Sequence, residues 1–69
     1  MTFGQKIRVR REELGFTQVE LAKKMQTTQP YISRLERGEF NPSKKMIIKM
    51  ATALDISIDY LLLDEIKAS

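Results

Sequence analysis

Residues 17–38, TQVELAKKMQTTQPYISRLERG, constrain the fold more than any other part of the chain, because they encode two short helices with only a tight turn between them. Thr17 is followed three residues later by Glu20, which is the spacing of a capping box at a helix start. Thr28 caps a second helix, which Gly38 ends. The stretch therefore predicts a helix-turn-helix at about residues 17–37.

The rest of the chain is helical in pattern as well, and nothing alternates convincingly as a strand. Further helices are expected at about 3–14, at 44–54, and at 58–63 or as far as 67, with Thr2, Ser43 and Ser57 as their caps. Five short helices with short loops predict one all-α domain, a compact bundle over residues 1–69. The residues expected inside are Phe3, Ile7, Leu14, Leu21, Ala22, Met25, Ile32, Leu35, Ile47, Met50, Ala51, Leu54 and Leu61, with Val19 partly so.

Charge is divided unevenly along the chain. Residues 1–49 carry a net charge of +6 and residues 50–69 a net charge of −3. A basic body with an acidic end fits a face that binds a polyanion, although ordinary solubilising surface explains the same counts. The chain has no Cys and no His, so we expect no disulfide, no thiol or imidazole zinc site, and no cofactor. Without a secretory core or a run of ~20 apolar residues, a soluble cytoplasmic domain with no membrane role is expected.

The third helix carries the residues with recognition chemistry. Ile32 and Leu35 are spaced to face inward, which leaves the opposite face to polar side chains. Glutamine can pair bidentately with adenine, and arginine with guanine, at about 1–3 kcal/mol of discrimination per pair. The expected base contacts are Gln29, Pro30, Ser33 and Arg34. A plain solvated face is the alternative for any single Gln or Arg, but two capped helices with a basic exterior favour DNA binding.

These residues carry a family resemblance. The chain resembles the Cro/repressor (XRE-type) helix-turn-helix family, which includes the lambdoid phage repressors, from FGQKIRVRREELGFTQVELAKKM through TTQPYISRLERGEFNPS to MATALDISIDYLL. The segments TQVELA, YISRLERG and NPS are specific in combination. The resemblance implies a lambda-repressor-like fold and a sequence-specific transcriptional regulator. Such a regulator binds double-stranded DNA as a homodimer on a two-fold symmetric operator, with one helix in the major groove.

The resemblance also implies roles for individual positions. Gln29 and Arg34 match the family's principal base contacts. Arg11 and Glu36 match a salt bridge between the first and third helices, which would orient the reading helix. The positions expected to contact phosphates include the caps of both helices of the motif. They are Thr17, Gln18, Thr28, Tyr31, Arg37, Asn41, Lys44 and Lys45.

Four residues depart from the family pattern. Gln26 stands where a turn glycine is usual, so it must take a left-handed conformation or the turn must differ. Arg10 and Lys44 replace apolar residues, and their stems are expected to lie along the core with the charges in water. Pro30 lacks a donor and can only contact an apolar feature such as a thymine methyl, so readout there should be weak.

The end of the chain, residues 56–69, is the candidate dimerisation segment. One helix in one groove covers few base pairs, and such modules bind as dimers to half-sites ~34 Å apart. Leu61 is assigned to the core, whereas the expected interface residues are Ile58, Leu62, Leu63 and Ile66. Tyr60 either joins them or closes the core.

Two other functions have to be weighed. The first is a protein-interaction module that keeps the fold without binding DNA, since fold does not fix function. The polar, basic exterior of the third helix argues against it. An enzyme is the weakest candidate, because the paired acids Glu12-Glu13 and Asp64-Glu65 are adjacent on solvated faces and no phosphate-cradling glycine loop is present. The sequence does not decide whether the regulator is a phage repressor, a restriction–modification controller or an antitoxin. It also does not identify a possible regulatory protein partner.

Overall fold

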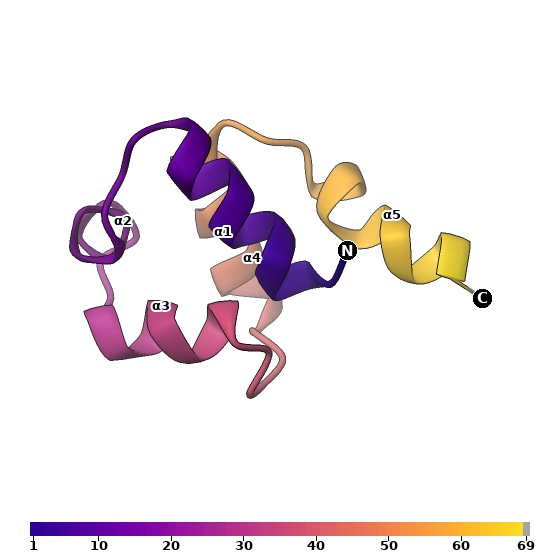
Figure 1. Cartoon of the computed structure of the whole chain (residues 1–69), viewed down its shortest axis with the longest axis horizontal. Coiled ribbons are helices and arrows are strands. Elements are labelled where there is room, and N and C mark those ends of the chain that lie inside the picture. Colours follow the sequence, from indigo (N-terminus) through magenta and orange to yellow (C-terminus); the bar gives the residue numbers. More distant parts are fainter. Residues whose placement is uncertain (69) are drawn as a thin grey trace.

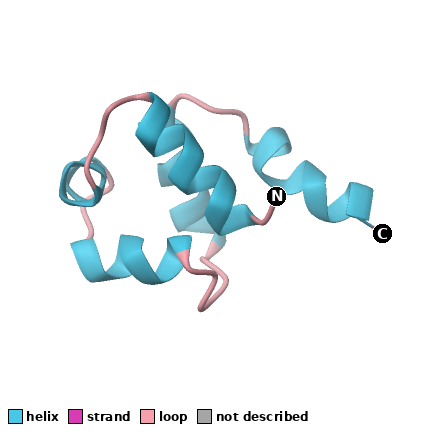
Figure 2. Ribbon diagram, viewed as in Figure 1, coloured by secondary structure: helices cyan, strands magenta, loops and turns pink. Residues whose placement is uncertain are grey.

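The computed structural model describes the backbone of residues 1–68 and the side chains of residues 1–63. Its five helices are α1 (Phe3–Glu13), α2 (Gln18–Lys24), α3 (Gln29–Glu36), α4 (Lys44–Leu54) and α5 (Ile58–Ala68) (Figure 1). All regular structure in this part of the chain is helical (Figure 2). The expected all-α bundle is confirmed, and α5 continues to the longer of the two limits expected for it.

The first helix organises the others. α1 contacts α3, α4 and α5, while α2 packs mainly on α3. α2 and α3 lie together at one end of the molecule, and α5 projects from the opposite end, beside the N-terminus (Figure 1). Between residues 1 and 68, every helix is too short or too polar to cross a bilayer.

Each of the first four helices begins at the hydroxyl residue that the sequence indicates, and Ser57 bonds the first turn of α5. The Thr17 N–H donates to Glu20 Oε1 at 2.8 Å, and the Glu20 N–H donates back to Thr17 Oγ1 at 3.1 Å. The hydrogen bond from the Thr17 backbone N–H holds the pKa of Glu20 below its ordinary value. The other side-chain caps are Thr2, Thr28, Ser43 and Ser57. These local bonds satisfy N–H groups that have no partner inside their helix.

Two helices end at a non-glycine residue in the left-handed conformation. Gln26 has φ 57°, which confirms the strained alternative expected for the turn after α2. The bend brings the Thr27 N–H to the Ala22 carbonyl at 2.8 Å, which closes the end of the helix. Asp55 does the same after α4 with φ 50°, and its sequence neighbourhood does not predict it.

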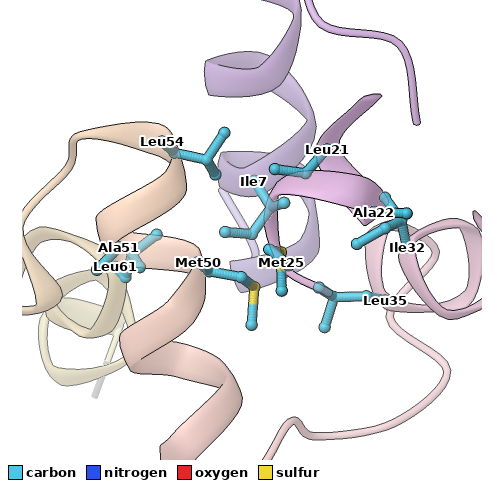
Figure 3. Close-up of a cluster of buried hydrophobic side chains, with 10 residues drawn as sticks. All are labelled: Ile7, Leu21, Ala22, Met25, Ile32, Leu35, Met50, Ala51, Leu54 and Leu61. Atoms are coloured by element: carbon cyan, nitrogen blue, oxygen red, sulfur yellow. The ribbon is translucent and has the colours of Figure 1, made fainter. Parts of the chain in front are cut away.

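The core lies between α1 and the other four helices. Its buried members are Ile7, Leu21, Ala22, Met25, Ile32, Leu35, Met50, Ala51, Leu54 and Leu61 (Figure 3). Phe3 and Ile47 are only half-buried, and Val19 is exposed. The expectation for Leu14 is wrong: it is 38% exposed, because α1 ends at Glu13 and Leu14 caps it beyond the packed face.

Three α1 residues fix this helix against its neighbours. Gly4 lies so close to α3 that a Cβ there would be 2.5 Å from the Leu35 carbonyl oxygen. The buried Lys6 donates its Nζ hydrogens to the carbonyls of Tyr60 and Leu61 in α5. Arg10 donates from Nε to the Leu54 carbonyl at 2.9 Å and so binds the end of α4.

The expected placement of the two long basic side chains therefore needs correction. The Arg10 charge is not left in water, because carbonyl groups at the end of α4 have no helical donor and accept its hydrogen bonds. Lys44 is exposed at the start of α4 and does not cover the core, because the half-buried Met46 and Ile47 fill that side of the helix.

Candidate DNA-binding surface

The α3 helix turns one side to the core and the other to solvent. Ile32 and Leu35 are completely buried on its inner side. The four expected base-contacting residues lie on its outer side. Gln29, Pro30 and Arg34 are exposed, and Ser33 is half-buried. The separation of core and polar residues that the spacing predicts along this helix is therefore present.

A chain of side-chain hydrogen bonds connects the start of α3 to α1. Gln29 Nε2 donates to Gln18 Oε1 at 2.7 Å, and Gln18 Nε2 donates to Glu36 Oε1 at 3.1 Å. Glu36 in turn accepts from Arg11. Since each amide has one acceptor and two donors, Gln29 keeps its Oε1 and one N–H for a ligand outside. Those two groups match the edge of adenine.

Arg11 and Glu36 form a largely buried, bidentate ion pair between α1 and α3. Arg11 Nε lies 2.6 Å from Glu36 Oε2, and Nη2 lies 3.1 Å from Oε1. The two side chains are only 11% and 4% exposed, and Arg11 Nη1 also donates to the Phe16 carbonyl at 2.8 Å. The hydrogen bond to Glu36 raises the pKa of Arg11. The expected pair is therefore present, and it joins α3 to α1.

Ser33 and Arg37 are brought together one turn apart on α3. Arg37 Nη1 donates to Ser33 Oγ at 2.9 Å, and its Nε donates to Glu39 Oε2 at 2.6 Å. Arg37 and Glu39 are both well exposed, so this pair is weak and exchangeable. Ser33 thus already accepts one bond on the outer side of α3.

The remaining expected phosphate contacts fall into three groups. Thr17 and Thr28 use their hydroxyl oxygens to accept N–H bonds in the first turns of α2 and α3. Tyr31 is half-buried, with its ring edge-on to Phe40 at 5.0 Å, and burial raises the pKa of its phenol. Three further positions are exposed around the α3–α4 loop and the start of α4: Asn41, Lys44 and Lys45.

The structure adds a residue that the sequence analysis did not select. Arg8 lines a surface hollow together with Gln18, Ser33, Arg37 and the Arg11–Glu36 pair. Arg8 is three residues before Arg11, and residues i and i+3 share a helix face, so this spacing is the sequence signal that could have placed Arg8 beside Arg11. The family pattern gave Arg11 a role and Arg8 none, so only the tertiary arrangement identifies it.

On α5, the expected division between core and surface holds in the described part. Leu61 is buried, whereas Ile58, Leu62 and Leu63 are each partly exposed, Leu63 to 46%. Tyr60 is also exposed, with its ring 4.6 Å from Lys6 Nζ. The side chain of Ile66 lies outside the described residues.

A capped helix, a tight left-handed turn and a second capped helix with a polar outer side define a helix-turn-helix protein of the DNA-binding class. Sequence comparison identifies the family within that class. The profile described as helix-turn-helix matches residues 7–61, and the chain belongs to this family, in its Cro/repressor (XRE) type.

Individual relatives agree with this assignment. The chain is 37% identical over 65 residues to the immunity repressor protein of Bacillus phage phi105, covering 94% of this chain and 45% of the relative. It is 40% identical over 63 residues to the HTH-type transcriptional regulator SinR of Bacillus subtilis, covering 90% and 56%. The chain thus spans about half the length of these curated relatives.

A solved structure shows the same fold on DNA. The P22 c2 repressor in complex with a synthetic operator superposes with a TM-score of 0.84 at 34% identity, covering 88% of this chain and 92% of that chain. The relatives are named as repressors and transcription regulators, and none of these names describes an enzyme.

Proposed function

We propose that this chain is a sequence-specific, double-stranded DNA-binding transcriptional regulator of the repressor or autoregulator type. The observation that carries the proposal is the outer side of α3, where Gln29 and Arg34 are exposed on a helix held to α1 by the buried Arg11–Glu36 pair. A helix of this kind fits the major groove, with its N-terminal residues at the base edges.

The base contacts follow from the donors and acceptors that remain free. Gln29 gives one amide hydrogen to Gln18 and keeps its Oε1 and its second N–H, so adenine is its expected partner. Arg34 is exposed and suits the O6 and N7 atoms of guanine. Pro30 offers only apolar contact, and Ser33 is restrained by Arg37, so both should discriminate less.

Phosphate contacts would hold α3 in register. The proposed set surrounds the start of each helix of the motif and the loop after α3, and consists of Thr17, Gln18, Thr28, Tyr31, Arg37, Asn41, Lys44 and Lys45. Tyr31 and Gln18 are half-buried and partly fixed by neighbours, so they lose little conformational entropy on binding. The lysines are exposed and would act mainly as charges.

Dimerisation is proposed through α5. Ile58, Leu62 and Leu63 are apolar and partly exposed on this helix, at the end of the molecule away from α2 and α3 (Figure 1). Ile66 is proposed with them from its place in the sequence. Two copies joined there would present their α3 helices to successive major grooves of a two-fold symmetric operator. The proposed place of action is the cytoplasm, at the chromosome when bound.

Duplex selection from a random pool, followed by salt titration of the selected site, tests the proposal. We expect a two-fold symmetric site and a binding constant that falls steeply with salt, with a log–log slope of about −0.9 per phosphate contact. A protein that binds no duplex, or binds one with no salt dependence, would instead be the interaction module that keeps the fold without DNA binding.

A further inference from the structure

One buried charge connects α1 to α5, the proposed dimerisation helix. Lys6 is only 3% exposed, and its Nζ donates to the carbonyl of Tyr60 and, at 3.4 Å, to the carbonyl of Leu61. The same Nζ lies 4.6 Å from the centre of the Tyr60 ring. Burial of an ammonium group is unfavourable unless the group is hydrogen-bonded, so its position is coupled to that of α5.

The two carbonyls that accept from Lys6 are inside a helix and do not need a side-chain donor. In an α-helix each carbonyl accepts from the N–H four residues further on. Because α5 runs from Ile58 to Ala68, the N–H groups four residues beyond Tyr60 and Leu61 belong to the same helix. The Lys6 bonds are therefore additional to those that close α5, and their removal leaves the helix its own bonds.

Apolar packing alone fixes the direction of α5 weakly. Leu61 is the one fully buried side chain among residues 58–63, the part of α5 whose side chains the structure describes. Burial of apolar surface has no preferred direction, so a helix held at one buried residue can pivot around it. Hydrogen bonds weaken steeply when they bend, and those of Lys6 therefore resist such a rotation.

The same helix, α1, is also fixed to α3. Gly4 approaches α3 so closely that a Cβ there would lie 2.5 Å from the Leu35 carbonyl oxygen. The buried Arg11–Glu36 pair holds α1 to α3 a second time, further along the helix. Lys6 lies between these two contacts in the sequence, so α1 sets the direction of α5 relative to α3 (Figure 1).

That direction matters for a dimer that reads two half-sites. The two reading helices have to enter major grooves one helical turn of DNA apart, which is 10–10.5 base pairs or about 34–36 Å. Each base pair inserted between the half-sites turns one of them by about 34–36° and moves it by about 3.4 Å. A dimer with a fixed α5 matches one spacing, whereas a dimer with a pivoting α5 can follow several.

We propose that Lys6 is a positioning residue for the operator: by fixing the direction of α5 relative to α3, it determines which spacing between half-sites the dimer accepts. The inference rests on the proposed function and its dimer, and it assigns the choice of spacing to a residue that makes no contact with DNA. The Lys6 ammonium group is buried against α5 and is not offered to a phosphate.

The test compares Lys6→Met with Arg10→Met. Both variants remove one positive charge from α1 together with bonds to backbone carbonyls, but Arg10 bonds the carbonyls of Leu54 and Asp55 at the end of α4. Affinity is measured for three duplexes: the site selected by the wild type, the same site with one base pair inserted between its half-sites, and a single half-site.

The wild type should bind the selected spacing much more tightly than the lengthened one. Lys6→Met should lower this affinity ratio about tenfold, which is the effect of losing one hydrogen bond to a charged group. Arg10→Met should keep the wild-type ratio. All three proteins should bind the single half-site within about twofold of one another, since both positions are remote from the reading side of α3.

An unchanged ratio in Lys6→Met, or an equal fall in Arg10→Met, would overturn the inference and leave the proposed function standing. A selected site without two-fold symmetry would do the same. A log–log salt slope lowered by about 0.9 in Lys6→Met alone would make Lys6 a phosphate contact and overturn it as well. Lys6→Gln, whose side chain is one bond shorter, gives the same comparison if circular dichroism shows Lys6→Met to be unfolded. Absence of duplex binding by the wild type would remove the proposed function too.

Discussion

The buried pair between Arg11 and Glu36 makes a stability prediction that depends on its burial. Replacing Glu36 with alanine removes the acceptor of two Arg11 bonds, at 2.6 and 3.1 Å, and of the Gln18 amide. Arg11, only 11% exposed, then keeps the Phe16 carbonyl at 2.8 Å and the more distant Glu12. The guanidinium is left with its charge largely unbalanced in a poorly solvated place.

The expected loss is large for a domain of this size. Breaking a buried pair costs about 3–5 kcal/mol, and the remaining bonds of Arg11 place Glu36→Ala near 3 kcal/mol. At about 0.05–0.15 kcal/mol per residue, the whole 69-residue chain has a free energy of unfolding of roughly 3–10 kcal/mol. With an m-value of about 1 kcal/mol/M, the urea midpoint measured by far-UV circular dichroism should fall by about 3 M or the variant should be unfolded in water.

Glu39→Ala is the matched control. Glu39 also lies 2.6 Å from an arginine nitrogen, that of Arg37, but this pair is exposed to 59% and 48%. Its removal should cost less than about 1 kcal/mol. Similar urea midpoints for Glu36→Ala and Glu39→Ala would refute the reasoning. They would mean that burial does not determine how much an ion pair of this length contributes to stability.

Three further predictions concern the ends and contacts of the helices. Gly4→Ala should destabilise the protein by about 1–3 kcal/mol or more in urea titration, because the new Cβ meets the rigid Leu35 carbonyl at 2.5 Å; an unchanged midpoint would mean that α1 moves away freely. Gln26→Gly should stabilise it by about 0.5–1 kcal/mol, as relief of the left-handed strain exceeds the entropy cost of glycine, and a lower melting temperature would contradict this. Since the pKa of Glu20 is lowered on folding, its cap bond should persist above the ordinary value of 4.5 and be lost as the pH falls through the lower folded value; an amide shift of Thr17 that moves only above 4.5 would be inconsistent with that.

Much of the fold is predictable from local chemistry. Thr17 with Glu20 and Thr28 with its following turn mark helix starts within four residues of sequence, and the structure has both bonds. The left-handed Gln26 was one of the two alternatives that the family resemblance left open for the turn, and the structure has it. The Arg11–Glu36 pair was accessible only through the family resemblance, because the partners are far apart in sequence and only the α1–α3 packing brings them together.

The failures come from tertiary packing that local patterns do not encode. Leu14 has helical spacing with Ile7, yet α1 ends one residue earlier and leaves it outside. Arg10 was expected in water, but the end of α4 offers it a free carbonyl. Arg8 is not among the site residues expected from the sequence, because its proximity to Ser33 and Arg37 depends on how α3 packs on α1.

The most direct measurement of the central claim, that the outer side of α3 reads sequence, is duplex selection with Arg34→Ala beside Lys45→Ala. Arg34→Ala should lose the preference at one base pair of each half-site, worth about 1–3 kcal/mol, while the rest of the site is kept. Lys45→Ala should weaken all duplexes about equally and keep the whole preference. An unchanged preference at every position with Arg34→Ala would contradict the account.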